Sequence, residues 1–170
     1  SKKLASGSNA ICLDVKVGSG AFMKDIESAT KLARLMVEIG KNAGRSMTAI
    51  LTDMDEPLGC AIGNALEVKE AIDVLNGKGN ENVTTLSLTL ATYMISMGKE
   101  ISFEEAKKEA IDALVSKKAL NKFNEFISYQ GGNINNLKIS NNTIEVYSNK
   151  TGYINDIDET KLAIECMKMG

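Results

Sequence analysis

One segment, between Ala10 and Met23, constrains the fold of this chain more than any other. Its apolar run, Ala-Ile-Cys-Leu-Asp-Val-Lys-Val, is followed at once by Gly18, Ser19 and Gly20. Such a run is typical of a buried strand that leads into a flexible loop at its carboxyl end. In open α/β sheets, ligands bind at that edge. The segment therefore predicts an α/β sheet with a ligand site beside the glycine loop.

Strand and helix alternate after this loop. Asp25 is placed to cap a helix whose apolar residues recur every three or four positions and which ends near Ala43 and Gly44. A second apolar strand follows over residues 46–52. A strand, a helix and a strand in this order imply a right-handed crossover and parallel pairing. The predicted fold class is therefore α/β, with a mostly parallel sheet flanked by helices.

Helices dominate the next part of the sequence. Asn64, with Glu67 three residues on, is predicted to cap a helix that closes at Gly77. Ser102 and Glu105 have the spacing of a second capping box. Further helices are predicted over residues 83–97, 103–115 and 119–129.

The composition changes after a pair of neighbouring glycines. Residues 137–147 alternate around two asparagines, which predicts a hairpin, and residues 158–169 predict a last helix. We therefore divide the chain into residues 1–133, part of an α/β domain, and residues 134–170, the beginning of a small carboxyl-terminal α+β domain.

Composition excludes several classes of protein. The chain has no histidine, so its residues cannot assemble a Ser-His-Asp or Cys-His nucleophile. Its net charge of -2 gives no basic excess for nucleic acid. The sequence has neither an apolar run of the roughly 20 residues that cross a membrane nor a secretory signal, so no membrane is involved and we expect a cytoplasmic protein. Three widely separated cysteines predict neither disulfides nor structural zinc.

Three ordered stretches carry a family resemblance. They are the segment from Ala10 to Met23, the stretch Leu-Thr-Asp-Met-Asp-Glu-Pro-Leu-Gly over 51–59, and Gly-Asn-Ala-Leu-Glu-Val-Lys-Glu over 63–70. Together they closely resemble the pyrimidine-nucleoside and thymidine phosphorylases. The resemblance implies a pentosyltransferase of nucleoside salvage, in which inorganic phosphate attacks the anomeric carbon of uridine, thymidine or deoxyuridine. The products are a pentose 1-phosphate and the free base. It also implies a homodimer for the full-length protein.

The resemblance implies a role for two residues at the pyrimidine. Lys2, the first lysine of Ser-Lys-Lys, corresponds to the family's base-contacting lysine, where a cation meets the negative charge that develops on the ring. Phe22 corresponds to an aromatic residue that lines the pyrimidine pocket. Taken without the resemblance, Lys2 would be a solvated surface charge, and Phe22 could equally be a core residue.

The resemblance also implies a site for a potassium-like cation. The matching positions are the backbone carbonyls of Leu58 and Ala61 and the carboxylate of Glu70. Hard cations prefer such oxygen ligands, and the ion would stabilise the loop and the start of the next helix. The residues alone would make Glu70 an exposed helix residue paired with a nearby lysine.

Compared with this family, the chain is expected to be a fragment that lacks the amino-terminal part, including the phosphate-binding residues. The fragment is therefore expected to be inactive by itself. No residue is assigned a catalytic role; Asp14, Lys16, Asp53 and Asp55 could orient a ligand or could form structural ion pairs.

Three further functions stay open at this point. A transferase like anthranilate phosphoribosyltransferase shares the architecture, but it needs diphosphate and magnesium motifs that this sequence lacks. A non-catalytic ligand-binding module would use the same fold without turnover. A nucleotide phosphorylase of the archaeal type would act on a nucleoside 5′-phosphate.

Overall fold

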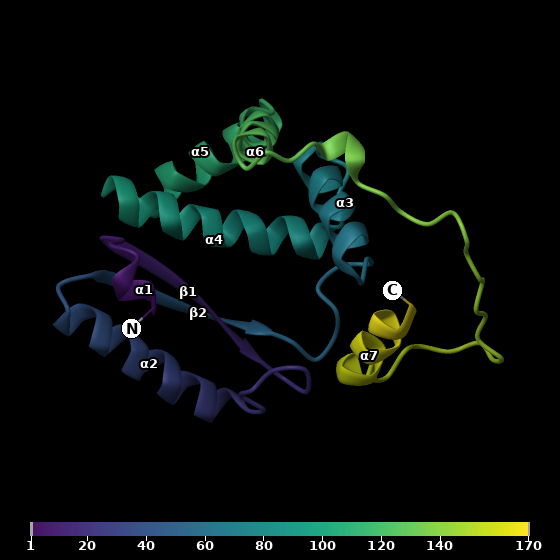
Figure 1. Cartoon of the computed structure of the whole chain (residues 1–170). Helices are drawn as coiled ribbons and strands as arrows, with labels where there is room; N and C mark the ends of the chain where they lie inside the picture. Colours follow the sequence, from purple (N-terminus) through teal and green to yellow (C-terminus); the bar gives the residue numbers. More distant parts are fainter. Residues whose placement is uncertain (1, 170) are drawn as a thin grey trace.

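Two parallel strands lie at the centre of the fold. The structure is a computed structural model that describes residues 2–169. It pairs β1 (Ala10–Val17) with β2 (Ser46–Asp53) along their whole lengths. Between them the chain forms α2 (Ile26–Asn42), which covers one face of the sheet (Figure 1). The predicted α/β class and the parallel pairing are confirmed.

The core forms where β1 meets α2. The residues that pack together there are alternate positions of β1 and two alanines of α2, namely Ile11, Leu13, Val15, Val17, Ala29 and Ala33. Alternation follows from the strand, whose successive side chains point to opposite faces. The predicted cap is confirmed, since Asp25 Oδ1 accepts a hydrogen bond from the Ser28 amide at 2.8 Å. This bond lowers the pKa of the Asp25 carboxyl group.

Helices on the other face of the sheet complete the body. They are α4 (Glu81–Lys99), which packs on β1, then α5 (Phe103–Val115) and α6 (Lys118–Tyr129). The capping box at the start of α5 is confirmed: the Ser102 amide donates to Glu105 Oε2 at 3.1 Å, and the Glu105 amide donates to Ser102 Oγ at 3.2 Å. The bond from the Ser102 hydroxyl lowers the pKa of Glu105.

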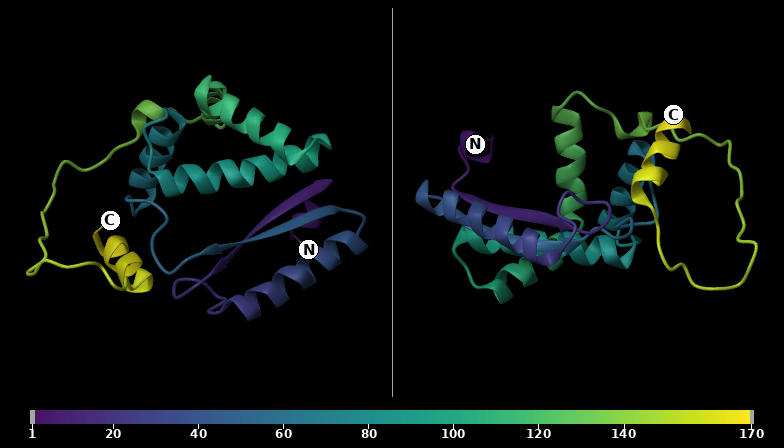
Figure 2. Two further views of the ribbon diagram at one scale, coloured as in Figure 1. Left: turned by 180° about the vertical axis from the view of Figure 1, so that it is seen from behind. Right: turned by 90° about the horizontal axis from the view of Figure 1, so that it is seen from below.

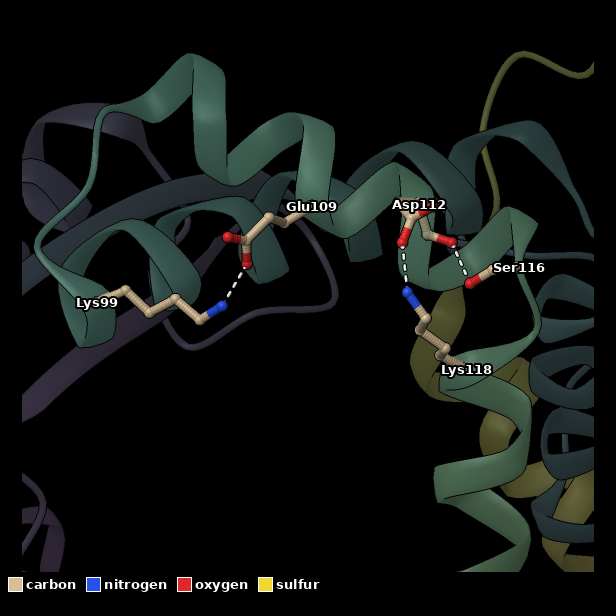
Figure 3. A network of polar contacts seen from close by, with 5 residues as sticks. All are labelled: Lys99, Glu109, Asp112, Ser116 and Lys118. Atoms are coloured by element: carbon tan, nitrogen blue, oxygen red, sulfur yellow. Dashed lines mark hydrogen bonds and ion pairs between the residues drawn. The ribbon is translucent and has the colours of Figure 1, made fainter.

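Ion pairs at the surface join these helices (Figure 3). Lys99 Nζ of α4 lies 2.5 Å from Glu109 Oε2 of α5, and Lys118 Nζ of α6 lies 2.8 Å from Asp112 Oδ2 of α5. The Ser116 hydroxyl donates to the Asp112 carbonyl at 2.6 Å, which helps to end α5. All of these groups are solvent-exposed, so the pairs contribute little to stability.

The start of α3 (Asn64–Leu75) differs from the prediction. Its N-cap is Gly63, with φ 117°, and Asn64 is the first helical residue. The Glu67 side chain, four residues after this cap, accepts a hydrogen bond from the Gly63 amide at 2.9 Å and so satisfies one amide at the start of the helix. The turn before the helix needs a positive φ, so glycine takes the cap position and asparagine does not.

The predicted hairpin after residue 137 is wrong. Within the described residues, 137–158 contain no helix or strand, and the chain runs outside the body before it returns as α7 (Glu159–Met169), as Figure 2 shows. Ile144 and Val146 are each 90% exposed. A hairpin needs a surface on which to bury such residues, and an isolated one is marginal at best. The last helix is confirmed, whereas the division at residue 133 stays a prediction.

Two smaller features complete the description. The four-residue helix α1 (Lys2–Ala5) precedes β1, and its Leu4 packs against the core. None of the helices over residues 2–169 combines the length and the apolar character needed to cross a membrane.

Candidate functional site

A cavity of about 680 Å³ lies at the carboxyl ends of the two strands. Lys16 of β1 and Asp53 of β2 line it at the sheet, and the loop after β2 and the start of α3 form its side. α7 closes another side with Thr160, Leu162 and Met167. The sequence prediction of a ligand site at this edge of the sheet therefore coincides with the cavity.

Acidic groups dominate the charged residues around the cavity. The lining contains one lysine, Lys16, together with five carboxylate side chains: Asp53, Glu56, Glu67, Glu70 and Glu159. Such a surface favours cations and hydroxyl-bearing ligands over a phosphate group. Any phosphate that reacts here therefore needs positive groups beyond those of this lining.

Lys16 is held by the strands themselves. Its Nζ atom lies 2.8 Å from Asp14 Oδ2, and the Thr52 hydroxyl of β2 donates to the other oxygen of Asp14. Cys12 lies on the same side of β1, and burial, with the nearby Asp14 carboxylate as a smaller cause, raises the pKa of its thiol. Cys12 is therefore a protonated structural thiol, and Asp14 and Lys16 form an ion pair.

The glycine loop is folded back onto the loop that follows β2. The Gly20 amide donates to the Met54 carbonyl at 3.0 Å, and the Ser19 amide donates to Asp55 Oδ1 at 2.6 Å. Asp53 Oδ1 in turn accepts from the Asp55 amide at 2.9 Å. Both aspartates thus satisfy backbone groups of the loops, which supports a structural role for the two residues.

The three residues proposed to hold a cation come together on the cavity wall. Leu58, Ala61 and Glu70 all line it. Glu70 Oε1 accepts a hydrogen bond from the Cys60 amide at 2.8 Å, so the carboxylate lies against the loop of residues 58–61. A Cβ atom at Gly59 would overlap this carboxylate. Glycine at this position therefore lets Glu70 approach the loop backbone.

A cation at Glu70 would need ligands other than a cluster of side chains. Over residues 2–169, no cluster of three or more acidic or cysteine side chains is arranged to hold a metal ion. A cation at Glu70 would consequently depend on backbone carbonyls, which are the oxygen ligands that potassium-like ions accept.

Lys2 and Phe22 lie apart from the cavity lining. Lys2 is exposed on α1, before β1, while Phe22 follows the glycine loop and is 100% exposed. This exposure excludes a core position for Phe22. The proposed contacts of both residues with a pyrimidine stay predictions.

Sequence reasoning missed Ser19 and Glu159. The Ser19 hydroxyl donates to Glu159 Oε2 at 3.0 Å, although the two residues are 140 positions apart. No local pattern marks either residue, because the contact exists only where α7 packs on the glycine loop. In the sequence, the glycines on either side of Ser19 indicate a loop but give no sign of its partner.

Comparisons with known proteins identify a family that has this architecture. Residues 1–120 match the model described as the glycosyl transferase family, a/b domain. The chain is 46% identical to a pyrimidine-nucleoside phosphorylase of Staphylococcus epidermidis strain ATCC 12228 and 45% identical to one of Staphylococcus aureus strain USA300. Each alignment covers 100% of this chain and 41% of the relative. The chain thus spans less than half the length of these relatives.

Proposed function

This chain belongs to the glycosyl transferase family that has the matched α/β domain, and we propose that it is the central part of a pyrimidine-nucleoside phosphorylase. The observation that carries the proposal is the identity of 45–46% over the whole chain to enzymes of that name. The cavity at the carboxyl ends of β1 and β2 supports it, because this edge is where α/β folds bind ligands. The full-length protein would be a cytoplasmic homodimer.

The proposed reaction is a phosphorolysis. An oxygen of inorganic phosphate forms a bond to the anomeric carbon of uridine, thymidine or deoxyuridine as the bond from that carbon to the ring nitrogen breaks. The electron pair passes to the base, which leaves after taking up a proton, and the other product is the pentose 1-phosphate. Lys2 would stabilise the charge that develops on the base, and Phe22 would hold its flat face.

Phosphate-dependent release of uracil or thymine tests the proposal. We expect a protein extended to the length of the relatives to release the base from uridine or thymidine, and the 170-residue chain to release none. The acidic lining of the cavity is the physical reason, because phosphate needs positive groups that this lining does not offer. Activity that instead requires phosphoribosyl diphosphate and magnesium would favour a phosphoribosyltransferase. Base binding without turnover in the extended protein would favour a binding module.

A potassium-like cation is part of the proposal. The carbonyls of Leu58 and Ala61 and the carboxylate of Glu70 would hold it, and the ion would neutralise the carboxylate and stiffen the loop at the start of α3. We expect potassium chloride to raise the melting temperature of the extended protein by about 3 °C or more over sodium or choline chloride at equal ionic strength.

Two variants isolate the contribution of Glu70 to this cation effect. Glu70→Gln keeps an acceptor for the Cys60 amide but removes the charge, so the potassium effect should disappear. Asp73→Ala removes a carboxylate of the same helix that is paired with Lys69 at the surface, and it should keep the effect. An equal rise in Glu70→Gln and in the unmodified protein would overturn the cation site.

A further inference from the structure

The contact between Ser19 and Glu159 joins two segments that the sequence keeps far apart. The Ser19 backbone is already occupied: its amide donates to Asp55 Oδ1 at 2.6 Å, and its carbonyl accepts from Lys24 Nζ at 2.5 Å. Its hydroxyl is therefore the group left to make a further contact, and it donates to Glu159 Oε2 at 3.0 Å. The glycine loop is thus fixed on one side by the loop after β2 and on the other side by α7.

The two segments also lie close together at Gly20. A Cβ atom on Gly20 would lie 3.4 Å from Glu159 Cβ and 3.1 Å from the Met54 carbonyl oxygen. The loop is therefore packed tightly between the Met54 backbone and the first turn of α7. α7 and the loop are thus close enough here for the position of one to affect the other.

Over residues 2–169, the contact with Ser19 leaves one oxygen of the Glu159 carboxylate without a hydrogen bond. Its second carboxylate oxygen, Oε1, is buried and has no hydrogen-bond partner among the described residues. A buried acceptor without a partner destabilises a fold and calls for a functional explanation.

The position of α7 depends on its contacts with the glycine loop and the cavity. Residues 137–158 connect it to the body without a helix or strand, and Figure 2 shows this tether running clear of the other elements. The chain therefore imposes little on where α7 lies, and its packing on the glycine loop and the cavity decides this. Phe22 follows on the same loop, only two residues after Gly20.

We propose that Glu159 is a positioning residue that couples the docking of α7 to the conformation of the glycine loop and so sets the position of Phe22. The coupling itself stands on the contacts above, whereas its consequence for a nucleoside rests on the proposed function. When α7 is docked, the loop that leads to Phe22 is held. When the Ser19 contact is lost, α7 and the loop loosen together.

Amide hydrogen exchange in the 170-residue chain tests the coupling. We expect Ser19→Ala and Glu159→Ala each to speed exchange about 2- to 10-fold in both segments, residues 18–23 and α7, which is the effect of one hydrogen bond. The double variant should exchange no faster than either single variant. Glu159→Gln keeps an acceptor for the Ser19 hydroxyl and should restore slow exchange. Glu165→Ala, on the same helix but paired with Lys168, is the matched control and should leave the loop unchanged.

Independent effects would overturn the coupling. In that case Ser19→Ala would speed exchange only in the loop, Glu159→Ala would speed it only in α7, and the two effects would add in the double variant.

The consequence for the nucleoside is tested separately in the extended enzyme. There both alanine variants should raise the KM for uridine and leave the KM for phosphate unchanged. An unchanged KM for uridine would overturn the role in positioning Phe22. Absence of phosphorolysis in the unmodified enzyme would refute the proposed function and leave the exchange result standing.

Discussion

Replacement of Lys2 by alanine in the extended enzyme is expected to lower kcat/KM for uridine about 100- to 1,000-fold. In the proposed reaction, the pyrimidine gains negative charge as the glycosidic bond breaks, and a fixed cation beside it stabilises the transition state more than the bound substrate. Loss of one such group costs a factor of this size in comparable sites. Steady-state rates of uracil release over a range of uridine concentrations measure the effect.

Lys3→Ala provides the matched control for this prediction. Lys3 is the neighbouring lysine of α1 and is exposed like Lys2, so its removal makes the same change in net charge at the same place in the chain. We expect it to change kcat/KM by less than about threefold. Equal losses in the two variants would mean that the region acts through its overall charge, and the assignment of Lys2 to the base would be wrong.

The second large effect is expected at Gly18. Its φ of 136° is one that side-chain-bearing residues rarely adopt, and a Cβ atom there would lie 2.6 Å from the Met54 carbonyl carbon and 2.6 Å from Asp55 Oδ1. Since the first of these is backbone, the clash cannot be relieved by a side-chain rotation. Gly18→Ala should therefore lower the free energy of unfolding by about 2–5 kcal/mol, the sum of backbone strain and overpacking. Urea unfolding followed by circular dichroism measures it.

Gly44→Ala separates the two causes of this loss. Gly44 also has a positive φ, of 71°, but a Cβ atom there would meet nothing within 4 Å. Its replacement should cost only the strain of the backbone, about 1 kcal/mol. If both variants lost the same stability, close approach of the glycine loop to Met54 would not contribute, and the tight packing inferred for this loop would be refuted.

Local signals predicted most of the secondary structure. The apolar run over 10–17 indicated β1, and the spacing of Ser102 and Glu105 indicated the start of α5. These signals are reliable because a buried strand and a capped helix each depend on residues close together in the chain. The two wrong predictions also rested on local signals alone. At Gly63 the backbone conformation of the turn outweighed the preference of asparagine for the cap, and over 137–147 alternation alone could not form a hairpin.

Part of the candidate site was predicted from the sequence, and part was found only in the structure. Leu58, Ala61 and Glu70 were identified through resemblance, and the fold brings all three to one wall of the cavity. The lining from α7 could not be predicted, because the tether over 137–158 carries no pattern that fixes where the helix returns. The buried oxygen of Glu159 was equally hidden, since burial depends on the partner surface and not on the residue.

The parallel α/β class, the order of the helices and the family can be read from the amino-acid sequence, because they depend on periodicity, caps and ordered motifs that lie within short stretches of chain. Three features became visible only in the folded chain: the glycine loop packs on the loop after β2, α7 closes the cavity, and Ser19 contacts Glu159 across 140 positions. Contacts of that range arise from packing of complete elements, in which shape and burial select the partners. No residue involved carries a local sign of its partner.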